Sequence, residues 1–251
     1  QPVRLDILEA NIYYHEVNVQ DYPLFEYQPY ELALSSKMVN VARQYDLDVM
    51  HVHYAIPHAY AAYSAKQILR AHGLYLPVIT TLHGTDITLV GRNPSYKPAV
   101  TFSINQSDFV TTVSSSLKAD TLEIFDVHKD IEVIPNFVDL ALYDHKDCKD
   151  TFSQGDEKII THLSNFRKVK RMGDVIEVFH RIQKEQPALL LMIGDGPEKE
   201  KVRQQAQELG IGDKVKFLGK TREVERILCL SDLFLLTSEK ESFGLAALEA
   251  M

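Results

Sequence analysis

The sequence predicts an α/β fold built from two Rossmann-like domains in tandem. Short apolar runs of strand length alternate with segments whose apolar residues recur at helical spacing. Short connections between such strands and helices favour parallel sheets that are covered on both faces. The polar stretch 144–157 has few apolar residues and interrupts the alternation, as a linker would. We therefore expect an N-terminal domain at residues 1–143 and a C-terminal domain at residues 158–251.

The first domain opens with an alternating segment at residues 11–19, which predicts a strand. Residues 30–45 carry apolar side chains at helical spacing, and the three serines from Ser114 suit the start of a later helix. The other expected strands lie at 48–54, 77–82, 108–113 and 131–134, and the other expected helices at 59–71, 98–106 and 114–125.

The second domain repeats the alternation. Its expected strands lie at 158–163, 188–193, 214–218 and 232–236, and its expected helices at 173–184, 197–209, 222–230 and from Ser242 onward. Ligands of parallel α/β sheets bind beyond the carboxyl ends of the strands. We expect the two sheets to face each other across a ligand cleft at those ends.

Composition and charge argue against several classes of protein. The chain has 251 residues, a hydrophobic content of 45% and a formal net charge of −8, which suits a globular protein better than a nucleic-acid-binding one. No apolar run reaches membrane-spanning length, so we expect no stable membrane association. Cys148 and Cys229 lack metal or redox spacing, and a reducing cytoplasm fits them best. Because the chain begins at Gln1 and ends at Met251 inside an expected helix, we expect a longer parent protein.

The segment around the last expected helix suits an anionic ligand. A helix that starts near Ser242 would present the free amides of residues 243–245 to a phosphate. Glu241 and Glu249 lie about 12 Å apart along such a helix and about 80° apart around it. Two carboxylates that flank a diphosphate could accept hydrogen bonds from sugar hydroxyls at each end, so a nucleotide sugar fits. The alternative is an amphipathic helix with two solvated glutamates.

A basic loop follows the first strand of the second domain. The run Ser164-Asn165-Phe166-Arg167-Lys168-Val169-Lys170-Arg171 would place positive charge at the rim of the cleft, where it could stabilise a departing diphosphate. The alternative is a solvated basic loop. The tight turn Gly194-Asp195-Gly196-Pro197 follows the next strand, but it lacks the third glycine of a dinucleotide fingerprint.

Histidines mark the first domain. His51 and His53 face one side of a strand and could hold a metal, but packing histidines are the simpler interpretation. Asp46-Leu47-Asp48 matches a D-x-D metal motif, yet it lies at the strand end away from the cleft, and we expect no metal. His83 stands at the carboxyl end of a strand, where it could meet a ligand, or it could form a turn-stabilising pair with Asp86.

The segment Glu241-Ser242-Phe243-Gly244-Leu245 with Glu249-Ala250-Met251 resembles the E-x7-E signature of the retaining GT-B glycosyltransferases of family GT4. The resemblance implies that the first glutamate contacts the transferred sugar, the second holds the ribose and the amides between them meet the diphosphate. The implied donor-binding residues are Glu241, Ser242, Phe243, Gly244, Leu245, Glu249, Gly194 and Lys170, and the implied catalytic residues are Lys170, Arg167, His83 and Glu241. No metal or other cofactor is implied.

Four segments resemble those members of the family that transfer N-acetylglucosamine to L-malate in the first step of bacillithiol biosynthesis. They are 54–58, 80–86, 164–171 and 238–244. This resemblance implies UDP-N-acetylglucosamine as donor and L-malate as acceptor, with Tyr54, Thr81 and Arg167 holding the acceptor. The family's usual arginine is replaced by Asn165, so Arg167 could bind either the diphosphate or the acceptor.

Other interpretations stay open. The acceptor could be a lipid or a glycan, and the same scaffold could serve a UDP-sugar epimerase or an inert binding domain. Whether the protein forms a homo-oligomer also stays open. The resemblance also implies that a first strand with a glycine-rich loop precedes Gln1, and that further strands and helices follow Met251. We expect the 251-residue chain alone to be inactive.

Overall fold

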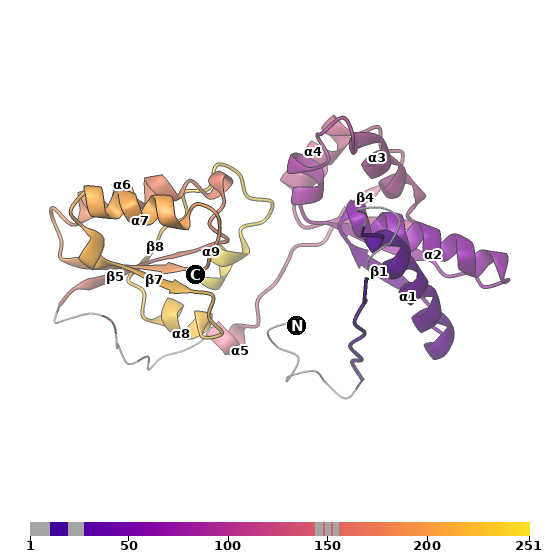
Figure 1. Cartoon of the computed structure of the whole chain (residues 1–251), viewed down its shortest axis with the longest axis horizontal. Coiled ribbons are helices and arrows are strands. Elements are labelled where there is room, and N and C mark those ends of the chain that lie inside the picture. Colours follow the sequence, from indigo (N-terminus) through magenta and orange to yellow (C-terminus); the bar gives the residue numbers. More distant parts are fainter. Residues whose placement is uncertain (1–10, 20–27, 144–147, 149–151, 153–155) are drawn as a thin grey trace. The chain divides into compact units, whose positions relative to one another are not determined.

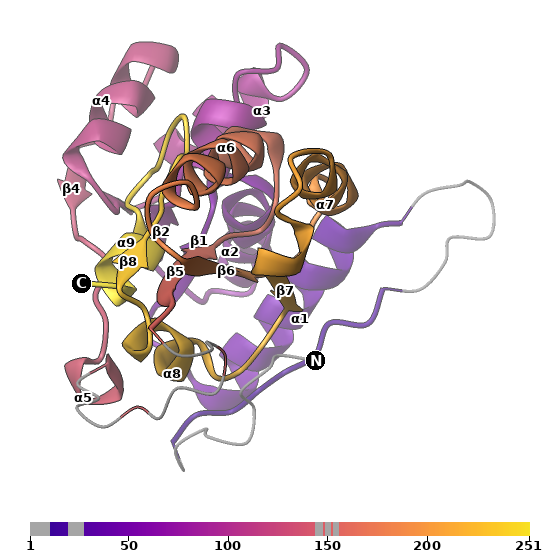
Figure 2. The same cartoon turned by 90° about the vertical axis from the view of Figure 1, so that its left-hand side faces the viewer.

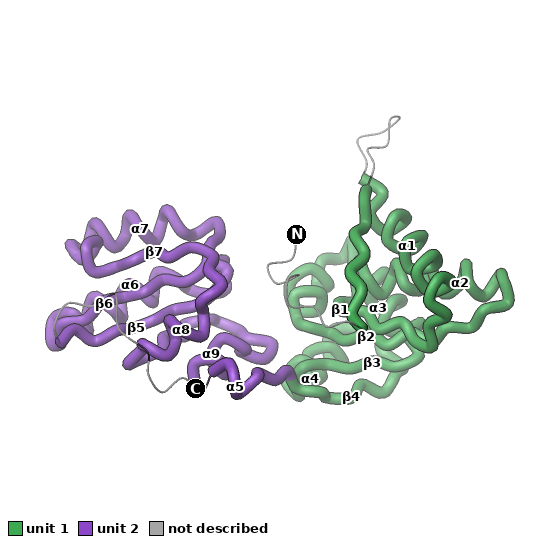
Figure 3. Tube along the Cα trace, turned by 90° about the horizontal axis from the view of Figure 1, so that it is seen from below, with its two compact units in different colours: residues 1–135 green, residues 136–251 purple. Residues whose placement is uncertain are grey.

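The computed structural model describes residues 11–19, 28–143, 148, 152 and 156–251. Contacts between residues divide the chain into two compact units, Gln1–Pro135 and Asn136–Met251 (Figure 3). The division falls before the expected domain end at residue 143, and most of the expected linker 144–157 lies outside the described residues.

The first unit is built on a parallel sheet in the order β1-β2-β3-β4 (Figure 1). The strands are β1 (Met50–His53), β2 (Val78–Leu82), β3 (Phe109–Thr112) and β4 (Ile131–Val133). In the register, His53 lies opposite Thr81, and Thr81 lies opposite Thr111. The carboxyl ends of neighbouring strands therefore bring a row of polar side chains together.

In the described residues of the first unit, four α-helices and two π-helical turns precede or connect these strands. They are α1 (Tyr30–Tyr45), α2 (Tyr60–Ala71), α3 (Lys97–Gln106), α4 (Ser115–Ile124), η2 (Ala55–Ala59) and η3 (Thr85–Leu89). Ala62 and Ala65 of α2 are fully buried, and such small side chains let the helix pack closely on the core. Ser114 caps α4 by accepting a hydrogen bond from the Leu117 amide at 3.1 Å, as expected from the three serines.

The second unit is built on a parallel sheet in the order β7-β6-β5-β8. The strands are β5 (Lys158–Leu163), β6 (Ala188–Ile193), β7 (Val215–Gly219) and β8 (Leu233–Phe234). All six residues of β6 are buried because the strand is central and covered on both faces. β8 is short, and its pairing with β5 covers only two residue pairs, Ile160 with Leu233 and Thr161 with Phe234.

Helices cover both faces of the second sheet. Figures 1 and 2 show α6 (Met172–Ile182) and α7 (Lys199–Glu208) on one face and α8 (Val224–Cys229) on the other. Phe179 and Val202 contribute to the core under α6 and α7, whereas Ile227 packs in the core under α8. Two short helices, α5 (Leu140–Tyr143) and α9 (Leu245–Glu249), and the 3-10 turns η4 (Lys168–Lys170) and η5 (Gly212–Lys214) complete the unit.

The predicted helix at 30–45 and the predicted strands at 158–163 and 188–193 are confirmed at both ends. The predicted strand at 11–19 is wrong, since this segment is a turn followed by irregular backbone. The alternation there reflects a different contact: the rings of Tyr13 and His15 both lie 5.4 Å from the ring of Tyr45 at the end of α1. Alternate side chains can pack on a helix end without any strand.

The two cysteines form a disulfide between Cys148 and the last residue of α8, Cys229, with their Cα atoms 6.1 Å apart. Their separation of 81 residues gave no sign of this link in the sequence. Disulfides are uncommon in the reducing compartment that the cysteine usage suggested. Within the described residues, no helix has the length and apolar character needed to cross a membrane.

Candidate functional site

The basic loop after β5 is held by the glycine turn after β6. Gly194 has φ +118°, and a Cβ atom there would lie 1.8 Å from the Ser164 carbonyl oxygen. A Cβ atom on Gly196 would lie 2.4 Å from the Asn165 carbonyl oxygen. Only glycine permits so close an approach, so the backbone of this turn packs directly against the backbone of the basic loop. The predicted donor residue Gly194 thus shapes the site through its backbone.

A second loop, which follows β8, is tied to the basic loop. The Glu239 amide donates to the Val169 carbonyl at 2.9 Å, and the Thr237 hydroxyl donates to the Lys170 carbonyl at 3.0 Å. The Lys170 ammonium donates to the Glu241 carboxylate at 2.6 Å, and both side chains are largely buried. Two predicted site residues that are far apart in the sequence therefore meet at the carboxyl ends of adjacent strands.

This pair offers two kinds of recognition at one point. The ammonium of Lys170 can stabilise a phosphate, and the carboxylate of Glu241 can accept a hydrogen bond from a sugar hydroxyl. The side chain of Arg167 is exposed, and its backbone is extended at the start of η4. Its two alternative roles, with diphosphate or acceptor, stay predictions.

The expected helix start near Ser242 is wrong. The helix α9 begins at Leu245, after Gly244 in a left-handed conformation with φ +86°. Its first intrahelical bonds run from the Ala247 and Leu248 amides to the Gly244 carbonyl. The amides of Phe243 and Gly244 therefore lie before the helix, because the glycine turns the chain three residues later than the sequence pattern suggested.

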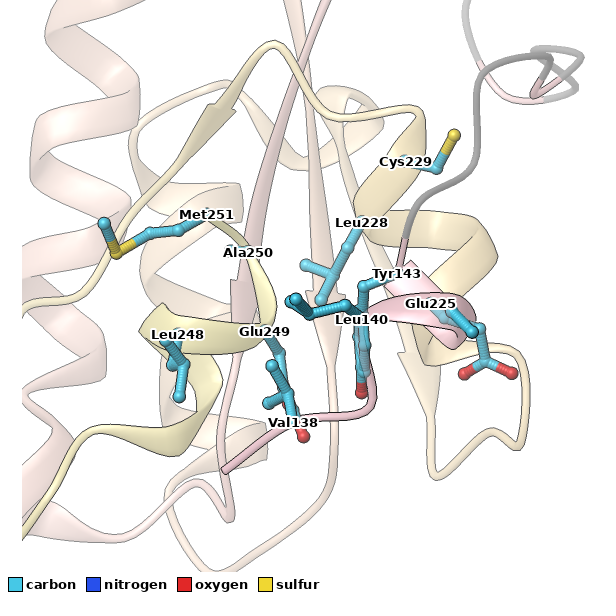
Figure 4. A pocket seen from close by; sticks show the side chains of 11 residues that line it. Val138, Leu140, Tyr143, Glu225, Leu228, Cys229, Leu248, Glu249, Ala250 and Met251 are labelled. Carbon is cyan, nitrogen blue, oxygen red and sulfur yellow. The ribbon is translucent and has the colours of Figure 1, made fainter. Parts of the chain in front are cut away.

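Glu249 lines a cavity of about 550 Å³ in the second unit. Figure 4 shows its side chain on the wall of this cavity with Val138 and with Leu140 of α5, and α8 contributes Leu228. Neither Lys170 nor Glu241 is among the lining residues. The predicted contact of Glu249 with a ribose stays a prediction.

In the first unit, the row of polar residues at the strand ends is a connected network. His53 Nδ1 lies 2.7 Å from His83 Nε2, and His51 Nε2 lies 2.8 Å from the Thr81 hydroxyl. The Thr81 hydroxyl also lies 2.7 Å from that of Thr111. The predicted acceptor residue Thr81 is therefore buried and already hydrogen-bonded on two sides.

The imidazoles of His53 and His83 favour their neutral forms. Burial lowers the pKa of His83, and the charge of His51 lowers it further against the opposing effect of Asp86. Burial also lowers the pKa of His53, together with the charges of His83, His51 and His58. A neutral imidazole has one donor and one acceptor, so this edge can bind hydroxyl groups.

Tyr54 follows β1 with φ +76°, a conformation that is rare for a bulky residue. Its ring lies 5.0 Å from that of His83, and its amide donates to the Thr81 carbonyl at 2.9 Å. Backbone strain of this kind tends to occur where a side chain must be aimed at a ligand. The structure thus brings the predicted residues Tyr54, His83 and Thr81 together.

Asp86 holds the turns that carry Tyr54 and His83. Its carboxylate accepts hydrogen bonds from the Ala55 amide at 2.8 Å and the Gly84 amide at 3.0 Å. Burial raises the pKa of Asp86 in spite of these bonds. Asp86 therefore stabilises this turn through backbone amides, whereas the His83 ring lies beside His53.

In the described part of the chain, no group of three ligating side chains is arranged to hold a metal ion. Asp46 adopts the left-handed conformation that ends α1. The expectation that no metal takes part stays a prediction.

Residues 3–142 match the family model for Glycosyltransferase Family 4, and residues 145–251 match the model for Glycosyl transferases group 1. The chain belongs to glycosyltransferase family 4. The predicted α/β fold with two parallel sheets is confirmed, and its structural neighbours are GT-B glycosyltransferases. The two model matches are separated at residues 143–144, next to the start of the expected linker.

Curated relatives are similar over the whole chain but are longer. The N-acetyl-alpha-D-glucosaminyl L-malate synthase of Bacillus anthracis is 50% identical over 254 residues, which cover 100% of this chain and 66% of the relative. An alpha-monoglucosyldiacylglycerol synthase of Streptococcus pneumoniae is 26% identical, with 94% of this chain and 57% of the relative covered. The chain thus spans about two thirds or less of these relatives' length.

Solved structures share the fold at low identity. A sucrose-phosphate synthase from Thermosynechococcus elongatus has a TM-score of 0.74 and 18% identity, with 92% of this chain and 62% of that chain covered. HepE of Anabaena in complex with UDP-glucose has a TM-score of 0.66 and 21% identity, with the same shares covered.

One feature of the site was missed in the sequence. His162 is the last but one residue of β5 and is fully buried. A histidine in a strand that is expected to be buried is the signal that could have identified it.

Proposed function

We propose that the protein transfers N-acetylglucosamine from UDP-N-acetylglucosamine to the hydroxyl of L-malate, with retention at the anomeric carbon, as the first step of bacillithiol biosynthesis. The observation that carries the proposal is the Lys170–Glu241 pair, 2.6 Å apart across two loops that interlock at the strand ends. The 50% identity to the malate synthase of Bacillus anthracis supports the choice of donor and acceptor.

In this proposal the second unit binds the donor. As the bond between the anomeric carbon and the diphosphate oxygen breaks, negative charge builds up on the diphosphate, and the nearby ammonium of Lys170 stabilises it. Glu241 accepts a hydrogen bond from the transferred sugar and keeps it oriented. The interlocked loops hold both groups in place before the substrate arrives, which reduces the cost of reorganisation.

The malate hydroxyl then attacks the anomeric carbon from the face that the diphosphate leaves. The hydroxyl proton passes to the leaving phosphate, so the products are the α-linked glycoside and UDP. No side chain is needed as a covalent nucleophile. Because Glu241 is already paired with Lys170, it suits sugar binding better than nucleophilic attack.

The first unit supplies the acceptor side in this proposal. The strained Tyr54 and the neutral His83 offer hydroxyl and imidazole groups, whereas the hydroxyl of Thr81 is already used within the network. A dicarboxylate also needs a cation, and the exposed Arg167 is available for that role if it does not bind the diphosphate. We place the enzyme in the cytoplasm, with small-molecule substrates as its partners.

A screen for UDP release in the full-length protein tests the function. Several UDP-sugars would each be combined with L-malate, other hydroxy acids or vesicles that contain diacylglycerol. We expect release only with UDP-N-acetylglucosamine and malate. Release with the vesicles would favour a lipid acceptor like that in the name of the Streptococcus relative. A rearranged sugar formed without acceptor would indicate an epimerase.

A further inference from the structure

The buried residue His162 is hydrogen-bonded at both ring nitrogens. Its Nδ1 lies 2.8 Å from the Leu235 carbonyl oxygen, and its Nε2 lies 2.8 Å from the Ser164 hydroxyl. A carbonyl only accepts, so Nδ1 carries the proton and donates. Burial lowers the pKa of His162, and the charge of Lys170 lowers it further against the opposing effects of Leu235 and Glu241. The ring is therefore neutral, and the Ser164 hydroxyl donates to Nε2.

These two partners are the starting points of the two interlocked loops. Ser164 directly follows β5 and opens the loop that carries Lys170, whereas Leu235 directly follows β8 and leads to Glu241. The β5–β8 ladder ends with the bond from the Leu235 amide to the Thr161 carbonyl at 2.8 Å. Just beyond this last backbone bond, the imidazole connects the two chains by hydrogen bonds from its own ring. It therefore extends the connection between the strands into the two loops.

The bridge extends into the basic loop itself. The Phe166 amide donates to the Ser164 hydroxyl oxygen at 3.3 Å, and the Phe166 ring is fully buried with its backbone at φ +34°. A polar ring in a strand core costs desolvation free energy, which an apolar residue of similar size would avoid. Such a network stabilises one particular geometry when all its members are satisfied, as they are here.

We propose that His162 is a positioning residue that fixes the spacing of the two loops, and hence of Lys170 and Glu241, for a nucleoside diphosphate. This inference rests on the proposed function, because it assigns the loops to the donor. His162 acts through its hydrogen bonds to Ser164 and Leu235 and does not itself contact the donor.

The test is a double-mutant cycle on UDP affinity, measured by calorimetry in the full-length protein. His162→Leu removes both bonds, whereas His162→Asn keeps an amide near the Nδ1 position that can donate to Leu235. We expect UDP affinity to fall about tenfold in His162→Leu and to be partly restored in His162→Asn. In a Lys170→Ala background, His162→Leu should weaken binding by less than about twofold, because the group that it positions is gone.

Hydrogen exchange of the Glu239 amide gives a second measurement that needs no ligand. This amide bonds to the Val169 carbonyl between the loops, so its exchange should accelerate at least about tenfold in His162→Leu. His180→Leu, a histidine substitution on α6, is the matched control and should change neither measurement. Ser164→Ala, which removes the bond to Nε2 and the bond from the Phe166 amide but keeps the bond from Nδ1 to Leu235, replaces His162→Leu if that variant does not fold.

The outcomes separate the two proposals. Equal losses of UDP affinity with and without Lys170, or a Glu239 amide that exchanges at the normal rate in His162→Leu, would overturn the positioning role. A wild-type protein that binds no UDP would overturn the proposed donor. In that case the exchange measurement would still decide whether His162 sets the spacing of the loops.

Discussion

Lys170 makes two separate contacts with the loop after β8. Its ammonium bonds to Glu241 at 2.6 Å, and its backbone carbonyl accepts from Thr237 at 3.0 Å. The backbone contact holds the residue in place while the side chain remains able to turn toward a phosphate. Because the side chain is only 19% exposed, little water competes for it, and an arriving anion would interact with it strongly.

Replacing Lys170 by alanine should lower kcat/KM for malate by a factor of about a hundred or more, because the ammonium proposed to stabilise the leaving diphosphate is removed. Steady-state kinetics of the full-length protein would measure this. Lys201→Ala, at a side chain that is 80% exposed on α7, is the matched control and should retain normal rates. A Lys170→Ala enzyme with wild-type kcat/KM would remove this residue from the mechanism.

Residue chemistry could be foreseen only in part. The strand-to-loop positions of Lys170 and Glu241 predicted that they would share one edge of a sheet, and the structure brings them into contact. Thr81 was expected to face an acceptor, but its hydroxyl is shared between His51 and Thr111. The register of neighbouring strands decides such bonds, and one strand's sequence does not contain it.

At the scale of elements, the glycine turn after β6 and the basic loop after β5 form one packed unit. Gly194 and Gly219 both adopt positive φ, at +118° and +69°. A Cβ atom would clash with the Ser164 carbonyl at Gly194, whereas at Gly219 it would meet nothing within 4 Å. An alanine at Gly219 would therefore introduce backbone strain alone, whereas an alanine at Gly194 would introduce the same strain and a steric clash.

Gly219→Ala should reduce the free energy of unfolding by about 1–2 kcal/mol, from backbone strain alone. Gly194→Ala should cost about 1–3 kcal/mol more, because the basic loop must also move. Gly194→Ala should also weaken UDP binding, whereas Gly219→Ala should leave UDP binding unchanged. Urea unfolding and calorimetry would measure both effects. Equal effects of the two substitutions on the free energy of unfolding and on UDP binding would contradict the conclusion that this turn supports the basic loop by direct packing.

The disulfide is another feature of the element scale, because it fastens Cys148 to the end of α8. Closing a segment of 81 residues stabilises the folded state by up to about 4.5 kcal/mol in the chain-entropy description. A reducing agent should therefore lower the melting temperature of the wild type and leave Cys148→Ser unchanged. Two thiols that react freely in the native protein purified without reductant would contradict the link.

Element boundaries were predictable where side chains set them. The helix at 30–45 was foreseen at both ends, and it ends at Asp46 in the left-handed conformation. The start of α9 was not, because its position depends on the left-handed Gly244 rather than on the helix-forming residues after Ser242. The alternation at 11–19 predicted a strand, but it arises because Tyr13 and His15 of this segment pack on Tyr45 of α1.

At the scale of the whole chain, buried histidines should make stability depend on pH. His53, His83 and His162 have lowered pKa values in the folded state, so the unfolded chain binds more protons just below pH 6.5. Their contribution is complete above pH 6.5 and is lost as the pH falls through the folded pKa values. The raised pKa of Asp86 has the opposite effect. Its contribution to the free energy of unfolding is complete below pH 3.8 and is lost as the pH rises through the folded pKa.

The free energy of unfolding should therefore decrease between pH 7.5 and about pH 5.5, as measured by urea titration. His162→Asn should make this decrease smaller, since one of the three lowered groups is removed. Stability that is constant or rises on acidification would contradict the assignment of neutral buried imidazoles.

The two-sheet organisation of the whole chain followed from alternation and from the polar stretch 144–157. Contacts nevertheless divide the chain after Pro135, so α5 belongs with the second unit. Composition marks where the chain becomes polar, whereas the packing of α5 against α8 depends on tertiary contacts that the sequence pattern does not show.

The most direct test of the account is the product formed by the full-length protein from UDP-N-acetylglucosamine and L-malate, identified by proton NMR. We predict UDP and an α-linked N-acetylglucosaminyl malate in equal amounts, with both nearly absent in Lys170→Ala. A β-linked product, or no UDP release when malate is present, would contradict it.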